Sequence, residues 1–525
     1  MEKRLLLAVV FSIIIMLVYP LFLAKINPPP VETGLSMQPL EQREVMNAPT
    51  REIELEPMEK SIPVDLDTTL LAADKYELEL TDLGGSIHNI RIKDGKRLDV
   101  DLVEGAVYDA GILAVEGKGN LSGLSSQLFE IKEDTKSFYI ERNGLIVAKE
   151  VRFLKDRYAL EASIKITNAS ELTQNLSFEI TTASNISTKE LYESRYTGAD
   201  VLYKDGKFKR ISGGKFKKRN TLYDNNIAWL ALRNKYYSII AKPSFTTAGV
   251  FTKNIKGAPV AGFIVEDARF SPGETKVYDI LFYIGPTDLD ELEKVDATFG
   301  KALNFGIFTS ISLVLLAVLK FFYGLFHNYG VAILLLTGCV SLLLYPLTFK
   351  SLKSMKGLQA LQPQMEKLRA EHKNNSTKLN KEIMELYRRH KVNPMGGCFP
   401  IFLQMPIFIA LYQTLMRSVE LKGATFLWIK DLSIPDAAFP LPVTLPILGS
   451  AINLLPILMI GAMILQQRLT HTKGAAQTEQ QKTMAMVMPL VFGFIFYSMP
   501  SGLVLYWLTN TLIQSSLQYF VVRKA

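Results

Sequence analysis

Twelve uncharged polar residues are the side chains best placed to do chemistry, because they interrupt stretches that are otherwise apolar and long enough to lie in a membrane. They are Thr337, Ser341, Gln404, Tyr412, Gln413, Thr414, Tyr497, Ser498, Tyr506, Thr509, Asn510 and Gln514. In lipid, such groups cost free energy unless they face one another or water, so we expect them to point inward. Two interpretations stay open at this stage: hydrogen bonds that hold helices together, or a water-filled cavity between helices.

Residues that could catalyse a reaction are scarce. Between residues 61 and 290 there is one histidine, His88, and no G-x-S-x-G or H-E-x-x-H motif; a lone histidine in a β domain is usually structural. The two cysteines, Cys339 and Cys398, lie in apolar stretches, which excludes a disulfide scaffold or a cysteine zinc cluster in 61–290. The apolar stretches after residue 330 have no charged residue in their interiors, which argues against a proton-coupled transporter. We predict no catalytic residue, no metal and no cofactor.

The elements that position these residues begin with an uncharged segment, residues 5–24. As a helix it reaches about 30 Å and crosses the hydrocarbon of a bilayer. Lys3 and Arg4 then keep the N-terminus in the cytoplasm. The alternative is a cleaved signal peptide, and either interpretation exports the residues that come after the segment. We assign residues 1–28 to a signal-anchor helix and residues 29–60, which contain prolines and acidic residues, to a linker.

The exported residues 61–290 are typical of a β-sandwich. Apolar residues alternate with polar ones along 158–166 and again along 176–180, as in half-buried strands. Gly84-Gly85 and Asn143-Gly144 are turn signals between such runs.

The rest of the chain is predicted to be helical. Residues 291–329 contain an apolar segment, 307–326, with Lys320 near its end. We expect this segment to lie in the membrane interface; the alternative, a further span, would invert the topology of all later residues. The next candidate spans are 330–349, 398–417, 442–465, 484–499 and 503–522, all within a core at 330–525. Basic residues follow the first, third and fifth of these, so we predict six spans with both termini in the cytoplasm.

The cytoplasmic loop at 350–392 is strongly basic, with eleven Lys or Arg and four Asp or Glu between residues 350 and 391. The net charge of +8 is therefore better explained by anionic headgroups than by recognition of a nucleic-acid sequence. Apolar residues recur at helical spacing on both sides of Asn374-Asn375-Ser376, which predicts two short antiparallel helices. Leu379, Ile383 and Leu386 form one seam; a solvated helix pair is the alternative.

Several strings in this core resemble, in family order, those of the YidC family of membrane insertases. They include Tyr345-Pro346, Leu361-Gln362-Pro363, Asn393-Pro394, Gly396-Gly397, Pro400, Pro406, and Pro500 with Gly502. The resemblance covers roughly 200 residues by sequence, and the N-terminal part resembles Gram-negative bacterial members in architecture alone. It implies an inner-membrane protein with a five-helix insertase core and an all-β periplasmic domain.

The resemblance also implies a hydrophilic groove inside the membrane. We assign to it Thr337, Ser341, Gln404, Tyr412, Tyr506, Thr509 and Asn510, and to the cytoplasmic hairpin Leu361, Pro363, Leu379, Ile383 and Leu386. Bacterial members typically have an arginine where this chain has Ser341, so a mechanism based on groove charge does not transfer unchanged. The implied partners are nascent membrane proteins, the ribosome, the Sec translocon and the lipid bilayer. A carbohydrate-acting or carbohydrate-binding β domain is the alternative function, because the family's β domain resembles mutarotase-like sandwiches.

Overall fold

The computed structural model describes residues 66–93, 100–103, 111–132, 137–186, 196–217, 219–372, 375–390, 392, 399–445, 449–470 and 479–524. Residues 59–475 and 488–525 form one compact unit, and residues 1–58 with 476–487 form another. Of the second unit only the start of one helix, from residue 479, is described. The signal-anchor helix and the linker predicted for residues 1–60 lie outside the described residues.

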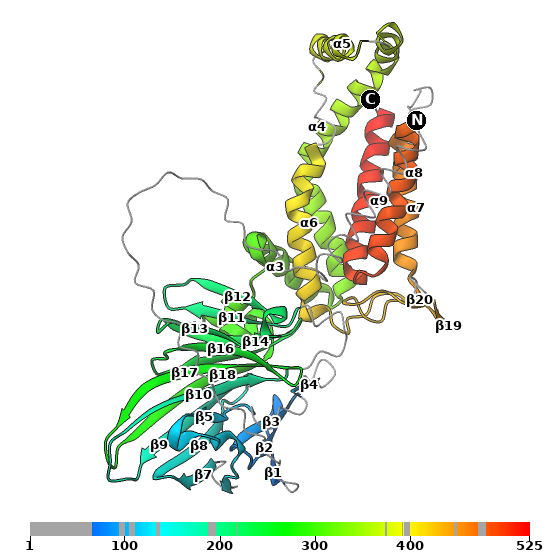
Figure 1. Cartoon of the computed structure of the whole chain (residues 1–525). Coiled ribbons are helices and arrows are strands. Elements are labelled where there is room, and N and C mark those ends of the chain that lie inside the picture. Colours follow the sequence, from blue (N-terminus) through cyan, green and yellow to red (C-terminus); the bar gives the residue numbers. More distant parts are fainter. Residues whose placement is uncertain are drawn as a thin grey trace, which may run out of the picture. The chain divides into compact units, whose positions relative to one another are not determined.

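The N-terminal part of the described chain is an antiparallel β structure of three sheets (Figure 1). The first sheet consists of β1 (Thr68–Ala72), β2 (Tyr76–Thr81), β3 (Ser86–Ile92) and β4 (Val100–Val103). The second has the order β13 (Asn220–Tyr223), β16 (Gly249–Ile255), β17 (Ala258–Phe270), β10 (Gln174–Ser184) and β5 (Val115–Gly117). The third has the order β12 (Phe208–Ser212), β11 (Gly198–Tyr203), β14 (Ile227–Arg233), β15 (Tyr237–Pro243), β18 (Thr275–Pro286), β9 (Ala159–Asn168), β8 (Leu145–Phe153), β7 (Ser137–Arg142) and β6 (Glu130–Lys132).

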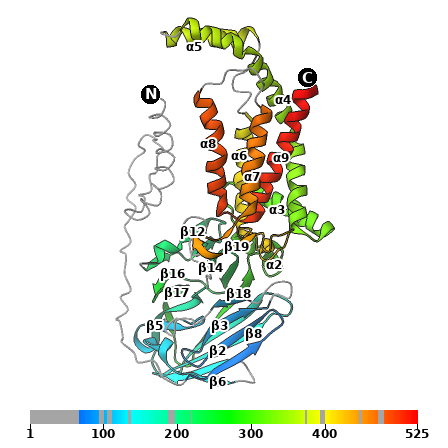
Figure 2. The ribbon, with the colours of Figure 1, turned by 90° about the vertical axis from the view of Figure 1, so that its right-hand side faces the viewer.

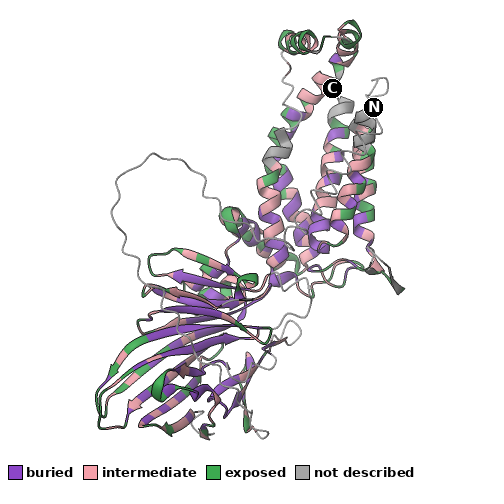
Figure 3. Ribbon diagram, viewed as in Figure 1, coloured by how far each residue is buried: buried purple, intermediate pink, exposed green. Residues whose placement is uncertain are grey.

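The predicted β-sandwich is confirmed. β14 and β15 of the third sheet lie against β17 and β10 of the second, and most residues of these four strands are buried (Figure 3). The alternation along 158–166 becomes β9, whose residues face alternately into the core and outward. Asn143 and Gly144 both adopt positive φ and join β7 to β8, which is the backbone that a two-residue hairpin turn requires.

The remainder of the described chain is mainly helical. Its α-helices are α2 (Leu289–Glu293), α3 (Thr309–Phe326), α4 (Tyr329–Glu371), α5 (Ser376–Arg389), α6 (Phe399–Arg417), α7 (Leu454–Thr470), α8 (Glu479–Tyr497) and α9 (Ser501–Lys524). α4, α6, α7 and α9 run side by side (Figures 1 and 2). α3 contacts α4 and α6 and crosses them instead of running alongside. Within the described residues, two helical stretches are long and apolar enough to span a membrane: Gly306–Phe326 and Tyr329–Leu358.

Two predicted boundaries are wrong. The span predicted at 442–465 begins only at Leu454, because β19 (Phe439–Leu445) and β20 (Gly449–Ile452) form a hairpin before it. The first arm of the basic hairpin is also no separate helix: α4 continues from the apolar region through Glu371 despite Pro346 and Pro363. The count of six spans stays a prediction.

Candidate functional site

Two hydrogen bonds between helices meet on one face of α9. Gln404 Nε2 on α6 donates to the Tyr506 hydroxyl at 2.7 Å, and Ser341 Oγ on α4 donates to Asn510 Oδ1 at 3.5 Å, the outer limit of a hydrogen bond. Residues 506 and 510 are four apart, so their side chains lie one above the other on the same helix face. We call Ser341, Gln404, Tyr506 and Asn510 the polar line.

The polar line is held by three helices and carries no ionisable group except the tyrosine hydroxyl. Tyr506 is buried, with 1% of its surface exposed, and Ser341 is 5% exposed, whereas Gln404 and Asn510 are half-buried. Both contacts, one between α6 and α9 and the other between α4 and α9, join neutral side chains and involve no buried charge. A serine at position 341 fits this arrangement, because its hydroxyl reaches Asn510.

Three other predicted groove residues are placed differently. Thr337 Oγ1 donates to Ile333 O at 2.6 Å, and Thr509 Oγ1 donates to Leu505 O at 2.7 Å. Both hydroxyls are therefore satisfied within their own helices, as threonine commonly is in a helix. Tyr412 packs against the apolar cluster of the helical core, close to Phe408. The structure thus brings four of the seven predicted groove residues together.

One end of the helical core is closed by the loop after α6. Gly502 N donates to Leu432 O at 2.9 Å, and Ser501 N donates to Ile434 O at 2.8 Å, so this loop is tied to the first turn of α9. A Cβ on Gly502 would lie 3.1 Å from Leu432 O, which explains why a residue without a side chain fits at this contact. Pro500, which precedes α9, is buried. This closed end faces the β domain. The same loop carries Glu420, whose carboxylate lies 3.2 Å from Lys320 Nζ, and Lys320 also contacts Asp288, which follows the last strand of the β domain.

At the other end, α4 and α5 form the two arms of the basic hairpin. Tyr387 hydroxyl donates to Met365 Sδ at 3.4 Å between the arms, and Leu361 is buried with 4% exposed. Leu379, Ile383 and Leu386 are half-buried, and Pro363 is exposed. α5 begins where the Asn375 side chain accepts from Lys378 N at 3.0 Å, as a helix N-cap does.

The remaining predicted motif residues fall into two groups. Tyr345 and Pro346 are exposed on α4, and Pro406 lies inside α6. Asn393, Pro394, Gly396 and Gly397 lie outside the described residues, and the side chain of Pro400 is likewise not described.

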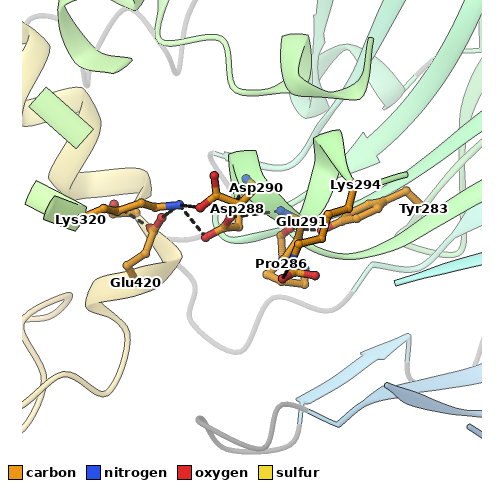
Figure 4. Close-up of polar contacts among 9 residues, drawn as sticks. Tyr283, Pro286, Asp288, Asp290, Glu291, Lys294, Lys320 and Glu420 are labelled. Carbon is orange, nitrogen blue, oxygen red and sulfur yellow. Dashed lines mark hydrogen bonds and ion pairs between the residues drawn. The ribbon is translucent and has the colours of Figure 1, made fainter. Parts of the chain in front are cut away.

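An ionic cluster that sequence reasoning did not identify joins the β domain to the helices (Figure 4). Lys320 Nζ on α3 lies 3.0 Å from Asp288 Oδ2, 2.9 Å from Asp290 Oδ2 and 3.2 Å from Glu420 Oε1. Asp288 also caps α2 by accepting from Asp290 N and Glu291 N. Lys320 is the feature of the sequence that could have indicated this cluster, because it is a single cation in an apolar segment. Its partners could not be identified, because they lie far from it in the sequence.

The pKa values of two carboxyl groups in this cluster, the buried Glu420 and the half-buried Asp288, shift in opposite directions. Burial raises the pKa of Glu420, and the nearby Lys320 ammonium offsets this only in part. Burial acts on Asp288 in the same direction, but the Lys320 charge and several hydrogen bonds outweigh it and lower the pKa of Asp288. Among the described residues no group of histidine, cysteine and acidic side chains is arranged to hold a metal ion.

Comparison with known proteins identifies the family. The model of the 60Kd inner membrane protein family matches residues 321–525, and that of the YidC periplasmic domain matches residues 132–318. Membrane protein insertase YidC of Pelobacter propionicus is 31% identical, and the alignment covers 99% of each chain. The chain belongs to the YidC family. As a YidC protein it is an inner-membrane protein with a periplasmic domain, as the resemblance of its motifs implied.

Likeness to solved structures is weaker. A crystal structure of an active YidC insertase, with its first transmembrane domain resolved, is 20% identical and covers 87% of this chain and 95% of its own, with a TM-score of 0.39. A putative aldose 1-epimerase of Escherichia coli K12 is 9% identical and covers 42% of this chain and 99% of its own, with a TM-score of 0.33. Neither score carries an argument about activity, so the carbohydrate alternative gains no support from them.

Proposed function

We propose that this YidC protein inserts membrane proteins by holding water along the polar line, so that a short hydrophilic segment of a client crosses part of the bilayer in contact with polar groups. The client's apolar helix then leaves sideways into lipid. The observation that carries this proposal is the pair of neutral contacts on one face of α9, Gln404 with Tyr506 and Ser341 with Asn510. The name of the relatives, membrane protein insertase, supports the activity.

The energetic basis is desolvation. A polar or charged client segment loses its water when it enters hydrocarbon, which costs several kcal/mol for each unsatisfied group. Side chains that both donate and accept hydrogen bonds, such as Gln404, Tyr506 and Asn510, can hold replacement water without imposing a charge preference. No covalent step, metal or nucleotide is needed for this mechanism.

The closed end of the core gives the groove a direction. The loop tied to Ser501 and Gly502 lies toward the periplasmic β domain, so we propose that the groove opens to the cytoplasm and to lipid. Clients then arrive from the cytoplasmic side, where the basic arms α4 and α5 are placed to meet the ribosome and the Sec translocon. α3 fits an interfacial helix, because Ser312, Leu315 and Leu319 are buried against the core while Val314 and Phe321 are exposed.

Reactivity of a cysteine in the polar line tests whether the line is wet. In a protein with Cys339 and Cys398 changed to serine, Ser341→Cys should react with a charged, water-soluble thiol reagent, because only a hydrated thiol forms the thiolate. Leu342→Cys is the matched control: residue 342 is the next residue on α4 and is 75% exposed on the outer surface, where lipid lies. Reaction at 341 without reaction at 342 is expected. An inert cysteine at 341 would show that the line is dry and packed.

Labelling also tests the orientation of the chain. A cysteine at Ser376 should be labelled only from the cytoplasm, and one at Ser163 only from the outside. Labelling of residue 376 from outside would mean that residues 307–326 span the membrane, and the proposed interfacial placement of α3 would fail.

A further inference from the structure

Two apolar turns project from the loop between α6 and α7. The first is closed by two hydrogen bonds between Phe426 and Ile429, Phe426 N to Ile429 O at 2.9 Å and Ile429 N to Phe426 O at 2.8 Å. Its tip consists of Leu427 and Trp428, which are 76% and 38% exposed. Leu427 has a φ of 51°, a left-handed conformation that a leucine adopts at a cost and that turns usually give to glycine or asparagine.

The second turn is the β19–β20 hairpin, which extends sideways from the start of α7 (Figure 1). Phe439, at its base, is 56% exposed. From Ala437 to Gln467 the sequence contains no Asp, Glu, Lys, Arg or His. A hairpin exposed to water normally carries charged residues on its edges to prevent association, and this one has none in its sequence.

Both turns are fixed to the end of the membrane helices by one carboxylate. Asp436 Oδ2 accepts from Trp428 Nε1 at 3.1 Å, from Leu454 N at 2.8 Å and from Leu455 N at 3.1 Å, and so it also caps α7. Asn453 Nδ2 donates to Tyr497 O at 2.8 Å, which ties the hairpin base to α8. The two turns are therefore held at the same end of the helical core, beside the start of α7 and the end of α8.

We propose that these two turns form an interfacial anchor that rests in the outer leaflet, at the level of the lipid headgroups and glycerol esters. Tryptophan beside a lysine, here Trp428 and Lys430, is a common combination at that depth. The hairpin does not enter the hydrocarbon, because a two-stranded sheet leaves backbone groups unpaired on both outer edges, and these need water or ester groups. Pro440 and Pro442 reduce that requirement by removing two donors.

The partner is thus the lipid surface itself and requires no particular headgroup charge. α3 supplies interfacial contact elsewhere on the core, so the core would be supported at two places on the periplasmic surface. This inference rests on the family's membrane location and is independent of whether the polar line holds water.

Depth-dependent quenching tests the anchor. The full chain, with Cys339 and Cys398 replaced by serine, is labelled with the environment-sensitive fluorophore NBD at Phe439→Cys or at Leu427→Cys and reconstituted in vesicles of phosphatidylethanolamine and phosphatidylglycerol. Lipids that carry a nitroxide near the ester should quench both labels more than lipids that carry it near the chain end, as expected for a depth of about 5–10 Å. Leu172→Cys is the control, an equally apolar residue that is 76% exposed in the β domain and should not be quenched by either lipid.

Three results would overturn the proposal. The labels at 427 and 439 would match the label at 172 if the turns were exposed to water. Their emission would shift only after a client is added if the turns bound client segments instead. It would depend on the ratio of protein to lipid if they formed a contact between two copies.

Discussion

Gln404 on α6 and Tyr506 on α9 are 102 residues apart in sequence, and the Gln404 side chain donates a 2.7 Å hydrogen bond to the Tyr506 hydroxyl. This contact and that of Ser341 with Asn510 place neutral polar groups on the face of α9 that meets α4 and α6. These contacts supply polarity between the helices without an arginine.

The Gln404–Tyr506 contact should show a measurable coupling energy. In a double-mutant cycle of Gln404→Leu and Tyr506→Phe, we expect a coupling of about 0.6 kcal/mol, and at most about 1.7 kcal/mol, as for other side-chain hydrogen bonds between membrane helices. Denaturant unfolding in detergent micelles provides the four free energies. The cycle of Gln404→Leu with Thr509→Val is the control and should be additive, because the Thr509 hydroxyl bonds to its own helix. Additivity in both cycles would mean that the contact contributes nothing.

Removal of Lys320 should destabilise the junction of the β domain with the helices. Lys320→Met leaves Asp288 and Glu420 without their shared cation, and Glu420 is only 5% exposed, so we expect a loss of about 3 kcal/mol in the free energy of unfolding. Adding Glu420→Gln to that variant should restore part of the loss by removing the buried charge. Lys294→Met is the control: the Lys294 side chain is 56% exposed, and its pair with Glu291 is expected to contribute less than about 1 kcal/mol. Equal losses for the two lysines would contradict the cluster's role.

The pH dependence of stability should reveal Glu420. Its pKa is raised above the ordinary 4.5, so the folded protein holds this proton more tightly than the unfolded chain does. The contribution is fully present below pH 4.5 and is lost as the pH rises through the folded-state pKa. Relative to Glu420→Gln, the wild type should therefore lose stability as the pH increases from 4.5. Thermal unfolding of the wild type and of Glu420→Gln across that range measures the difference.

Two glycines of α4 should respond in opposite ways to alanine. A Cβ on Gly330 would lie 2.1 Å from the Phe426 side chain, so Gly330→Ala must displace that side chain and should loosen the turn that carries it. A Cβ on Gly338 meets nothing within 4 Å, so Gly338→Ala should be neutral or stabilise the helix by up to about 1 kcal/mol. Protease cleavage within residues 418–436 reports on the loop and should increase only in Gly330→Ala. An unchanged cleavage rate in that variant would show that Phe426 moves aside without opening the loop.

Local patterns predicted most of the fold. The alternation of apolar and polar residues along 158–166 was sufficient to predict β9, because successive residues of a strand face alternately inward and outward. Hydropathy alone predicted a membrane span from residue 442, but the β19–β20 hairpin precedes α7 there. The hairpin is as apolar as a membrane helix, so hydropathy does not distinguish the two. The basic arm was assigned correctly to helix, but its continuity with α4 through Pro346 and Pro363 depends on packing that a single sequence does not contain.

The candidate site was only partly predictable for a similar reason. The sequence identifies which residues are polar, but a threonine in a helix can bond to its own backbone, as Thr337 and Thr509 do, or to a neighbouring helix. The pairing of Lys320 with Asp288 and Glu420 joins three segments far apart in the chain. Residue type and spacing along one helix therefore do not show which partner a threonine hydroxyl takes, or which carboxylates Lys320 contacts.

Insertion of a client with a short, charged translocated tail tests the central claim most directly, measured by protease protection in reconstituted vesicles. The polar-line variant combines Gln404→Leu, Tyr506→Phe and Asn510→Leu. The matched control combines Thr337→Val, Thr509→Val and Thr511→Val, three hydroxyls that bond within their own helices. If water along the polar line lowers the barrier by even about 1.4 kcal/mol, the polar-line variant should insert the client about tenfold more slowly, while the control stays near the wild-type rate. Equal insertion by the two folded variants would contradict the account.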